Sequence, residues 1–194
     1  MGNIYYIMGK SASGKDRIYS LLLKRQDLNL KKLILYTTRP VRAGETDGEN
    51  YHFVSEEILH RFEESGRLIE ARSYNTVQGI WTYFTADDGQ VNLSEADYLG
   101  IGTLESFVKM KEYYGGKVIP IYIQVEDGVR LERALGRERE QKKPDYEEMC
   151  RRFLADQKDF SEQKIEAAGI CMRFENNRLE DCAEEIVNYI KSMQ

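Results

Sequence analysis

Histidine, cysteine and long apolar runs are scarce in this 194-residue sequence, and each shortage excludes a class of protein. The two histidines, His52 and His60, have no spacing to a nucleophile that would predict a catalytic pair. The three cysteines lack metal-binding spacing and leave an odd thiol, so we expect reduced, mostly buried thiols. No apolar run reaches the roughly 18 residues of a membrane helix, and residues 1–10 do not resemble a signal peptide. We therefore expect a cytoplasmic protein that does not enter a membrane.

Charge of one sign is also modest: 28 Lys and Arg against 33 Asp and Glu give a net charge of −5. A mildly acidic chain has no overall attraction for nucleic acid, so any anion it binds must be held by a local site. Hydrophobic residues make up 41% and charged residues 31%, which suits a folded core and not a disordered or collagen-like chain. The length fits one core with an appendage, or two rather small domains.

Short apolar segments alternate with amphipathic ones along the chain, which indicates βαβ units and a parallel sheet. The expected strands are 3–8, 32–36, 51–54, 68–74, 81–85, 99–101, 117–125 and 170–174. The expected helices are 14–24, 55–66, 104–113, one capped by Asp127, and two with apolar faces at 146–154 and 179–190. The stretch from Tyr51 to Thr85, with short strands and one helix, predicts an appendage. Residues 130–164 are dense in charge and predict a solvated lid.

Residues 9–16 read G-K-S-A-S-G-K-D and match the phosphate-binding pattern G-x-x-x-x-G-K between a buried strand and a helix. Backbone N–H groups of such a loop surround a phosphate, and the helix adds the positive end of its dipole. The predicted ATP-binding residues of the loop are Gly9, Lys10, Ser11, Ala12, Ser13, Gly14, Lys15 and Asp16. The alternative is an ordinary strand–helix turn with a surface lysine.

Asp16 stands where this pattern usually has Ser or Thr. An ionised Asp cannot donate to a phosphate, but it is a better ligand for a hard cation, so we expect Asp16 to bind Mg²⁺. The alternative is that Asp16 only suits the start of the helix.

A second cluster of basic and aromatic residues begins at Thr37 and runs to Val54. By itself it fits a solvated turn, but two Arg with neighbouring hydroxyls also suit a phosphate. Together with the loop, the segment resembles guanylate kinases, whose pattern T-T-R-x-x-R-x-G-E-x-D-G-x-x-Y-x-F-V is met at every fixed position. Weaker similarities follow at 68–71, 133–137, 151–154 and 176–179, so that the resemblance covers most of the chain.

The resemblance implies transfer of the ATP γ-phosphate to GMP or dGMP, with Mg²⁺ and no covalent intermediate. It assigns acceptor binding to Thr37, Arg39, Arg42, Tyr51, Glu70, Tyr83 and Thr85, with Glu70 accepting hydrogen bonds from guanine. It assigns catalysis to Lys15, Arg39, Arg133, Arg137 and Arg152, and contact with adenine to Asn176. Tyr83 and Thr85 are aligned with less support, because residues 77–81 are longer than in the family and unlike it.

One departure from the family concerns its acidic strand end, which helps to bind guanine and the metal. Gly100 and Gly102 stand in place of both acids here. The sequence therefore leaves two alternatives to a guanylate kinase: a binding module of the same fold without catalysis, and a P-loop kinase with another acceptor.

The predicted fold is α/β, with a P-loop NTPase-type parallel sheet flanked by helices, a small acceptor-binding α+β insertion and an Arg-rich helical lid. We assign the core to residues 1–36, 96–129 and 160–194, the insertion to about 37–92 and the lid to about 130–159. ATP and the acceptor nucleotide are the expected partners, and we expect neither nucleic acid nor a membrane among them.

Overall fold

A central parallel sheet and a second, smaller sheet organise the computed structural model, which describes residues 2–76 and 79–194. The central sheet has the strand order β2-β7-β1-β8-β9, and every neighbouring pair is parallel. Its strands are β1 (Ile4–Met8), β2 (Leu30–Lys32), β7 (Asp97–Gly102), β8 (Val118–Gln124) and β9 (Arg173–Glu175). The predicted α/β class with a parallel sheet is confirmed.

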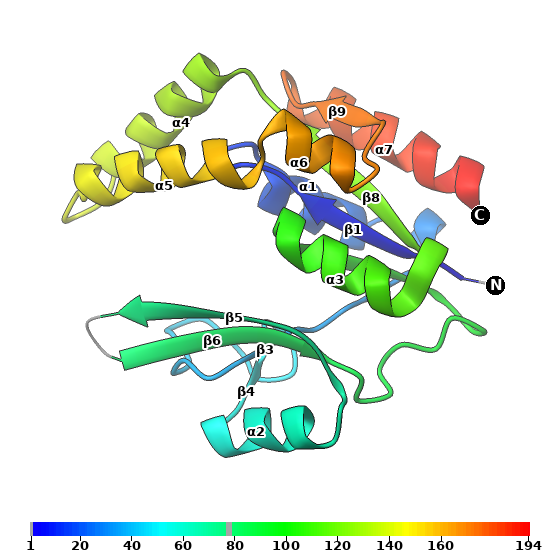
Figure 1. Cartoon of the computed structure of the whole chain (residues 1–194). Helices are drawn as coiled ribbons and strands as arrows, with labels where there is room; N and C mark the ends of the chain where they lie inside the picture. Colours follow the sequence, from blue (N-terminus) through cyan, green and yellow to red (C-terminus); the bar gives the residue numbers. More distant parts are fainter. Residues whose placement is uncertain (1, 77–78) are drawn as a thin grey trace.

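Strand β1 lies in the middle of the central sheet and divides the core into two halves (Figure 1). Ile4, Tyr6 and Met8 pack on one face with residues of α3 and α6, whereas Tyr5 and Ile7 pack on the other face with α1 and α7. Successive side chains of a strand point to opposite faces, so an unbroken apolar strand is required where helices cover both sides.

Helices cover both faces of this sheet and extend beyond it (Figure 1). The helices are α1 (Lys15–Leu23), α2 (Glu56–Glu64), α3 (Leu104–Tyr114), α4 (Asp127–Arg139), α5 (Tyr146–Asp159), α6 (Glu162–Ala167) and α7 (Leu179–Met193), with short 3-10 turns η1 (Gln26–Leu28) and η2 (Gly115–Lys117). No helix in the described part of the chain is both long and apolar enough to cross a membrane.

The smaller sheet lies within the segment predicted as the insertion and has the order β4-β3-β6-β5. Its strands are β3 (Tyr36–Thr37), β4 (His52–Phe53), β5 (Leu68–Thr76) and β6 (Gly79–Ala86). Helix α2 packs on it through Phe62, which joins Tyr36 and Phe84 in a separate apolar cluster. Part of the predicted 77–81 segment, residues 77–78, lies outside the described residues.

The single strand predicted at 32–36 is wrong, because the chain changes sheets there. The backbone of Leu33 donates to Leu99 in the central sheet, whereas Leu35 accepts from His52 in the smaller sheet. Between them, the Gln90 side chain accepts from Ile34 N–H at 2.8 Å and donates to its carbonyl at 3.1 Å. A side chain 56 residues away therefore makes the hydrogen bonds to the Ile34 N–H and carbonyl that a neighbouring strand would otherwise make.

The predicted lid is a hairpin of two helices, α4 and α5, that projects from the core (Figure 1). Its second helix does not bury the apolar face expected from the sequence: Tyr146 and Leu154 are exposed, as is Cys150. The expected cap of α4 is also wrong by one residue, because the Glu126 carboxylate, and not Asp127, accepts from the N–H groups of Gly128 and Val129.

Two other expectations are corrected. Cys150 and Cys171 are exposed and only Cys182 is buried, so the thiols are not mostly buried. The last predicted strand begins three residues later than expected, at Arg173, because Gly169 adopts φ 73° and the N–H of Ile170 still bonds back to Ile165 at the end of α6.

Candidate active site

The phosphate-loop segment connects β1 to α1 in the conformation that its glycines allow. Gly14 has φ 84°, and a side chain there would collide with the Asn176 amide. At Gly9 a Cβ atom would lie 2.6 Å from the carbonyl oxygen of Ile123. Only glycine fits at either position. The Ser13 hydroxyl is buried within the loop and has no hydrogen-bond partner among the described residues.

Lys15 and Asp16 lie side by side at the start of α1. The Lys15 ammonium is 3.2 Å from the Asp16 carboxylate, and the Asp16 side chain is 80% exposed. Among residues 2–76 and 79–194, no three His, Cys, Asp or Glu side chains gather as a metal cluster. Mg²⁺ commonly takes one or two carboxylates together with phosphate oxygens and water, so the exposed Asp16 carboxylate fits a nucleotide-bound Mg²⁺.

A buried Arg joins the loop to the lid. Arg130 of α4 donates to the carbonyl of Ser11 at 2.8 Å and bonds to Asp127 and Asp156. The Asp156 carboxylate in turn accepts from the Ser11 N–H at 2.7 Å. Lys10 extends the same contact, since its ammonium donates to Gln157 at 2.8 Å. The first turn of the loop is thus held by both lid helices, and the predicted ATP contact of Lys10 faces the base of the lid.

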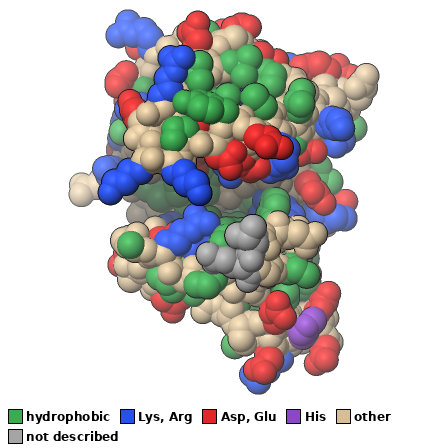
Figure 2. Space-filling view, turned by 90° about the vertical axis from the view of Figure 1, so that its left-hand side faces the viewer, with side chains coloured by type: hydrophobic (Ala, Val, Ile, Leu, Met, Phe, Trp, Pro, Cys, Tyr) green, Lys and Arg blue, Asp and Glu red, His purple; other side chains and the backbone are tan. Residues whose placement is uncertain are grey.

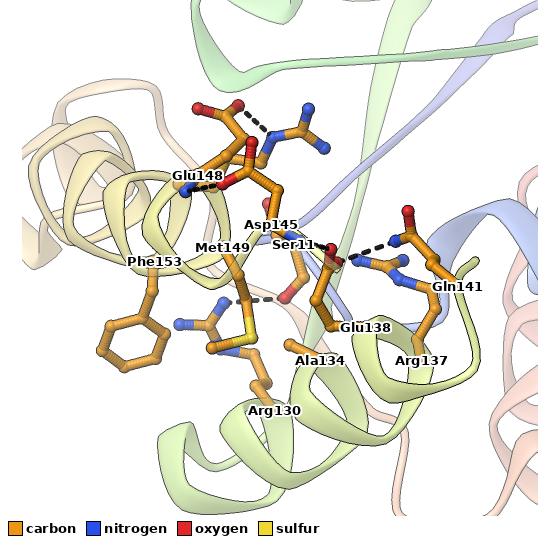
Figure 3. Close-up of a pocket in the computed structure, with 11 residues that line it drawn as sticks. Ser11, Arg130, Ala134, Arg137, Glu138, Gln141, Asp145, Glu148, Met149 and Phe153 are labelled. Carbon is orange, nitrogen blue, oxygen red and sulfur yellow. Dashed lines mark hydrogen bonds and ion pairs between the residues drawn. The ribbon is translucent and has the colours of Figure 1, made fainter. Parts of the chain in front are cut away.

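Three predicted arginines lie in the lid, in different settings. Arg133 reaches across to the carbonyl of Asn176 at 3.0 Å, next to the phosphate loop. Arg137 and Arg152 line a pocket of about 320 Å³ between α4 and α5 (Figure 3). Arg152 is paired with Glu148 at 2.6 Å, and the acidic residues Glu138, Asp145 and Glu148 all line the same pocket. Asn176, the predicted adenine contact, donates to the Ser13 carbonyl at 2.8 Å and supports the loop.

The predicted phosphate clamp of the acceptor site centres on Arg39, whose side chain is only 3% exposed. Its guanidinium forms a bidentate ion pair with Glu45, at 2.5 and 2.6 Å, and donates to the Tyr83 hydroxyl at 3.0 Å. It also lies 5.1 Å from the centre of the Tyr51 ring. The neighbouring Arg42 lies over Trp81. The structure thus brings Arg39, Arg42, Tyr51 and Tyr83 together, with both tyrosine rings beside Arg39.

Thr37 is in a different position from these four residues. It is fully buried, and its hydroxyl donates to the Thr82 carbonyl at 3.0 Å and accepts from the Arg39 N–H. It fixes the backbone from which Arg39 projects.

The Arg39–Glu45 pair predicts a pH dependence of stability. The Arg39 hydrogen bonds lower the pKa of Glu45 from 4.5 to about 2. A carboxyl with a lowered pKa stabilises the fold above its unfolded pKa and loses this contribution as the pH falls from about 4.5 to about 2. We expect wild type to lose more stability over this interval than Glu45→Gln in urea unfolding. The exposed Glu57→Gln should follow wild type, and parallel curves for all three proteins would contradict the prediction.

Glu70, the predicted guanine contact, lies on β5 with its side chain only 2% exposed. It already has three donors: Arg72 Nε at 2.9 Å, Arg72 Nη2 at 3.3 Å and the Thr85 hydroxyl at 3.0 Å. Burial alone would lower the pKa of Arg72, but the charge of Glu70 helps to raise it above its ordinary value. Arg72 was not anticipated from the sequence, although its position two residues after Glu70 in a strand places both side chains on one face.

The two glycines in place of the family's acids lie beside Tyr6. A side chain at Gly100 would come within 2.8 Å of the Tyr6 ring, and one at Gly102 would collide with its hydroxyl. The Tyr6 hydroxyl donates to Ser106 at 2.9 Å, and burial raises the pKa of Tyr6 above its ordinary value. The space that strand-end carboxylates would need is therefore filled by an aromatic ring.

Viewed from the end of the lid, Lys and Arg side chains lie on both sides of a hollow between the insertion and the rest of the molecule (Figure 2). A basic hollow of this kind, next to a phosphate loop, suits polyanionic ligands.

Comparison with known proteins agrees with this geometry. The family model for guanylate kinase matches residues 1–83, which include the loop and the Arg39 cluster. The chain is thus similar to guanylate kinases, most clearly over its first 83 residues.

Individual relatives extend the family match unevenly. Guanylate kinases of Chromobacterium violaceum and Hahella chejuensis are 31% and 36% identical over 104 residues each. These alignments cover about half of this chain and 49% of each relative. The guanylate kinase of Anaplasma phagocytophilum is 25% identical over the whole chain, which spans 88% of that relative.

The crystal structure of a guanylate kinase from Anaplasma phagocytophilum shares the fold, with a TM-score of 0.66 and 22% identity. It covers this whole chain and 86% of the crystallised chain.

Proposed function

We propose that this protein transfers the γ-phosphoryl group of ATP to the phosphate of GMP or dGMP, giving ADP and GDP or dGDP. The observation that carries the proposal is the pairing of two phosphate sites on one chain: the glycine loop with Lys15 and the Arg39 cluster on the insertion. The loop lies between β1 and α1 of the core, and the Arg39 cluster lies beside the smaller sheet; Lys and Arg side chains lie on both sides of the hollow seen in Figure 2.

The chemistry asks the protein for positioning and for neutralisation of charge, because phosphoryl transfer needs no covalent intermediate. Backbone N–H groups of the loop and Lys15 hold the ATP phosphates. Arg39, Arg42 and the hydroxyls of Tyr51 and Tyr83 orient the acceptor phosphate. Four of the five N–H groups of Arg39 are engaged by Glu45, Tyr83 and Pro40. These hydrogen bonds fix the position of the guanidinium charge beside the acceptor phosphate.

The lid supplies the remaining positive charge. Arg133 is next to the loop, and Arg137 and Arg152 face the pocket between the lid helices. Movement of this hairpin over the bound phosphates would exclude water that could otherwise accept the phosphoryl group. The cytoplasm, which supplies ATP and nucleoside monophosphates, is the proposed location.

Asp16 is the residue that would hold Mg²⁺, which neutralises phosphate charge when bound. We expect Asp16→Asn to raise the Mg²⁺ concentration for half-maximal activity by about tenfold, since one of few protein ligands is lost. The measurement is activity against Mg²⁺ concentration for wild type, Asp16→Asn and Asp16→Ser. Superimposable curves would show that Asp16 serves only the start of the helix.

The proposal is tested by ADP formation from ATP with GMP, dGMP, AMP, CMP and UMP in parallel, with product nucleotides identified by chromatography. GDP formation with GMP supports it. Consumption of ATP with another acceptor alone would keep a P-loop kinase and discard the guanylate reaction. A second candidate, a binding module without catalysis, is favoured by the glycines at 100 and 102, and would show nucleotide binding without ADP formation.

A further inference from the structure

The base end of the acceptor site contains an ion pair that changes what a base can bind there. Glu70 and Arg72 lie on β5, with side chains 2% and 13% exposed, and share two hydrogen bonds. A carboxylate has about four lone-pair sites. Arg72 Nη2 and Thr85 both donate to Oε1, and Arg72 Nε donates to Oε2. One acceptor position therefore remains, on Oε2.

Guanine has two neighbouring donors, N1–H and the 2-amino group, and a carboxylate that binds both must offer two acceptor positions. Those two donors would take one position on each oxygen, and Oε1 is already filled. The strand end offers no substitute, because Gly100 and Gly102 carry no acceptor and the Tyr6 ring fills the adjacent space. With the ion pair intact, Glu70 has an acceptor position for only one of these two donors, and when N1–H takes it the 2-amino group gains no carboxylate partner.

Arg72 instead presents donors. A guanidinium has five N–H groups, and three of those of Arg72 are engaged by Glu70 and Thr103, which leaves two without a partner among the described residues. A pair of Arg N–H groups matches two neighbouring acceptors on a base edge, such as the O6 and N7 atoms of a 6-oxopurine. Adenine has an amino group in place of O6, which would face a second donor.

We propose that Arg72 sets the specificity of the acceptor site: it withdraws Glu70 from reading guanine donors, and it selects 6-oxopurine nucleotides with or without the 2-amino group. The inference rests on the proposed function and extends the acceptor from GMP to IMP.

The test compares kcat/KM for GMP, IMP and AMP in wild type, Arg72→Met and Arg72→Gln. Wild type should use GMP and IMP within about threefold of each other and reject AMP. In Arg72→Met the released Glu70 can accept from N1–H and the 2-amino group together, so the GMP-to-IMP ratio should rise at least tenfold, as expected for a hydrogen bond to a charged group. The double variant Glu70→Gln/Arg72→Met should lose that gain.

Two controls separate specificity from stability. Arg72→Gln keeps one hydrogen bond to Glu70, and it stands in for Arg72→Met if the latter does not fold by circular dichroism. The exposed Arg61→Met on α2 should keep the wild-type ratio. A merely structural Arg72 would lower all rates together and leave the ratio unchanged, which would overturn the proposal. So would a wild-type preference for GMP over IMP above tenfold that Arg72→Met does not increase.

Binding of GMP and IMP by calorimetry gives the same ratios without catalysis. If no acceptor is phosphorylated, the proposed function fails, and the calorimetric ratios still decide the role of Arg72. Failure of Arg72→Met and Arg72→Gln to gain affinity for GMP relative to IMP would overturn the role of Arg72 alone.

Discussion

Lys15→Met should lower kcat for ADP formation by at least about 10²-fold while the protein stays folded. Lys15 lies at the start of α1, and its only ion-pair partner in the described structure is the exposed Asp16 carboxylate. Loss of that exposed pair should change stability by no more than about 1 kcal/mol. The missing positive charge should therefore lower the rate of phosphoryl transfer, where it stabilises the transferring group, much more than the stability of the fold.

Single-turnover rates and melting temperatures measure both parts of this expectation. Lys24→Met removes an exposed lysine from the end of the same helix and should behave as wild type. Lys10→Met provides a second comparison inside the loop, since Lys10 contacts the lid residues Gln157 and Asp127. Full activity of Lys15→Met at an unchanged melting temperature would refute a phosphate-binding role for this loop.

Local sequence predicted the loop because its motif is continuous between a strand and a helix. The positive φ of Gly14 is a constraint within the loop, whereas Gly9 is required by the close carbonyl of Ile123 on β8, which the motif does not show. Helix α7 was predicted for a similar reason, since its apolar face repeats at helical spacing, whereas α6, which packs on the core through Ile165, was not predicted.

Two of the errors arise because a sequence pattern does not show what packs beside a segment in the fold. The strand at 32–36 divides because Gln90 satisfies the peptide of Ile34. The apolar pattern at 146–154 suggested a buried face, but α5 packs against α4 in the projecting hairpin, and Tyr146 and Leu154 are exposed. The Arg72–Glu70 pair was overlooked although strand spacing alone places both residues on one face.

These tertiary partners also concentrate where the parts of the molecule meet. Arg130 joins the loop to the lid, Gln90 lies at the junction of core and insertion, and Arg72 faces Thr103 at the start of α3. Sequence patterns within one element carry no information about such contacts. The polar residues that connect the parts are therefore the ones that only the structure reveals.

Arg130→Met should destabilise the protein by about 3 kcal/mol, the lower end of the cost of breaking a buried ion pair. Arg130 is 1% exposed and has Asp127, Asp156 and the Ser11 carbonyl as partners. Met fills part of its volume, but it leaves the Asp156 carboxylate, 15% exposed, without a cation. The lower end of the range applies because Asp127 is 43% exposed and water can solvate it.

The same substitution should also weaken ATP binding, because Arg130 bonds to the Ser11 carbonyl and Asp156 accepts from the Ser11 N–H, so that both fix the backbone of the loop. Urea unfolding and ATP titration measure the two effects. Arg151→Met is the matched control: its guanidinium pairs with Glu148 on the lid surface and is 64% exposed, so we expect a change below about 1 kcal/mol. Equal stabilities of the two variants would mean that the lid hairpin is not anchored to the loop through Arg130. In Arg130→Met/Asp156→Leu, both charges are removed and stability should recover, whereas ATP affinity should stay low because the Ser11 peptide still lacks its partners.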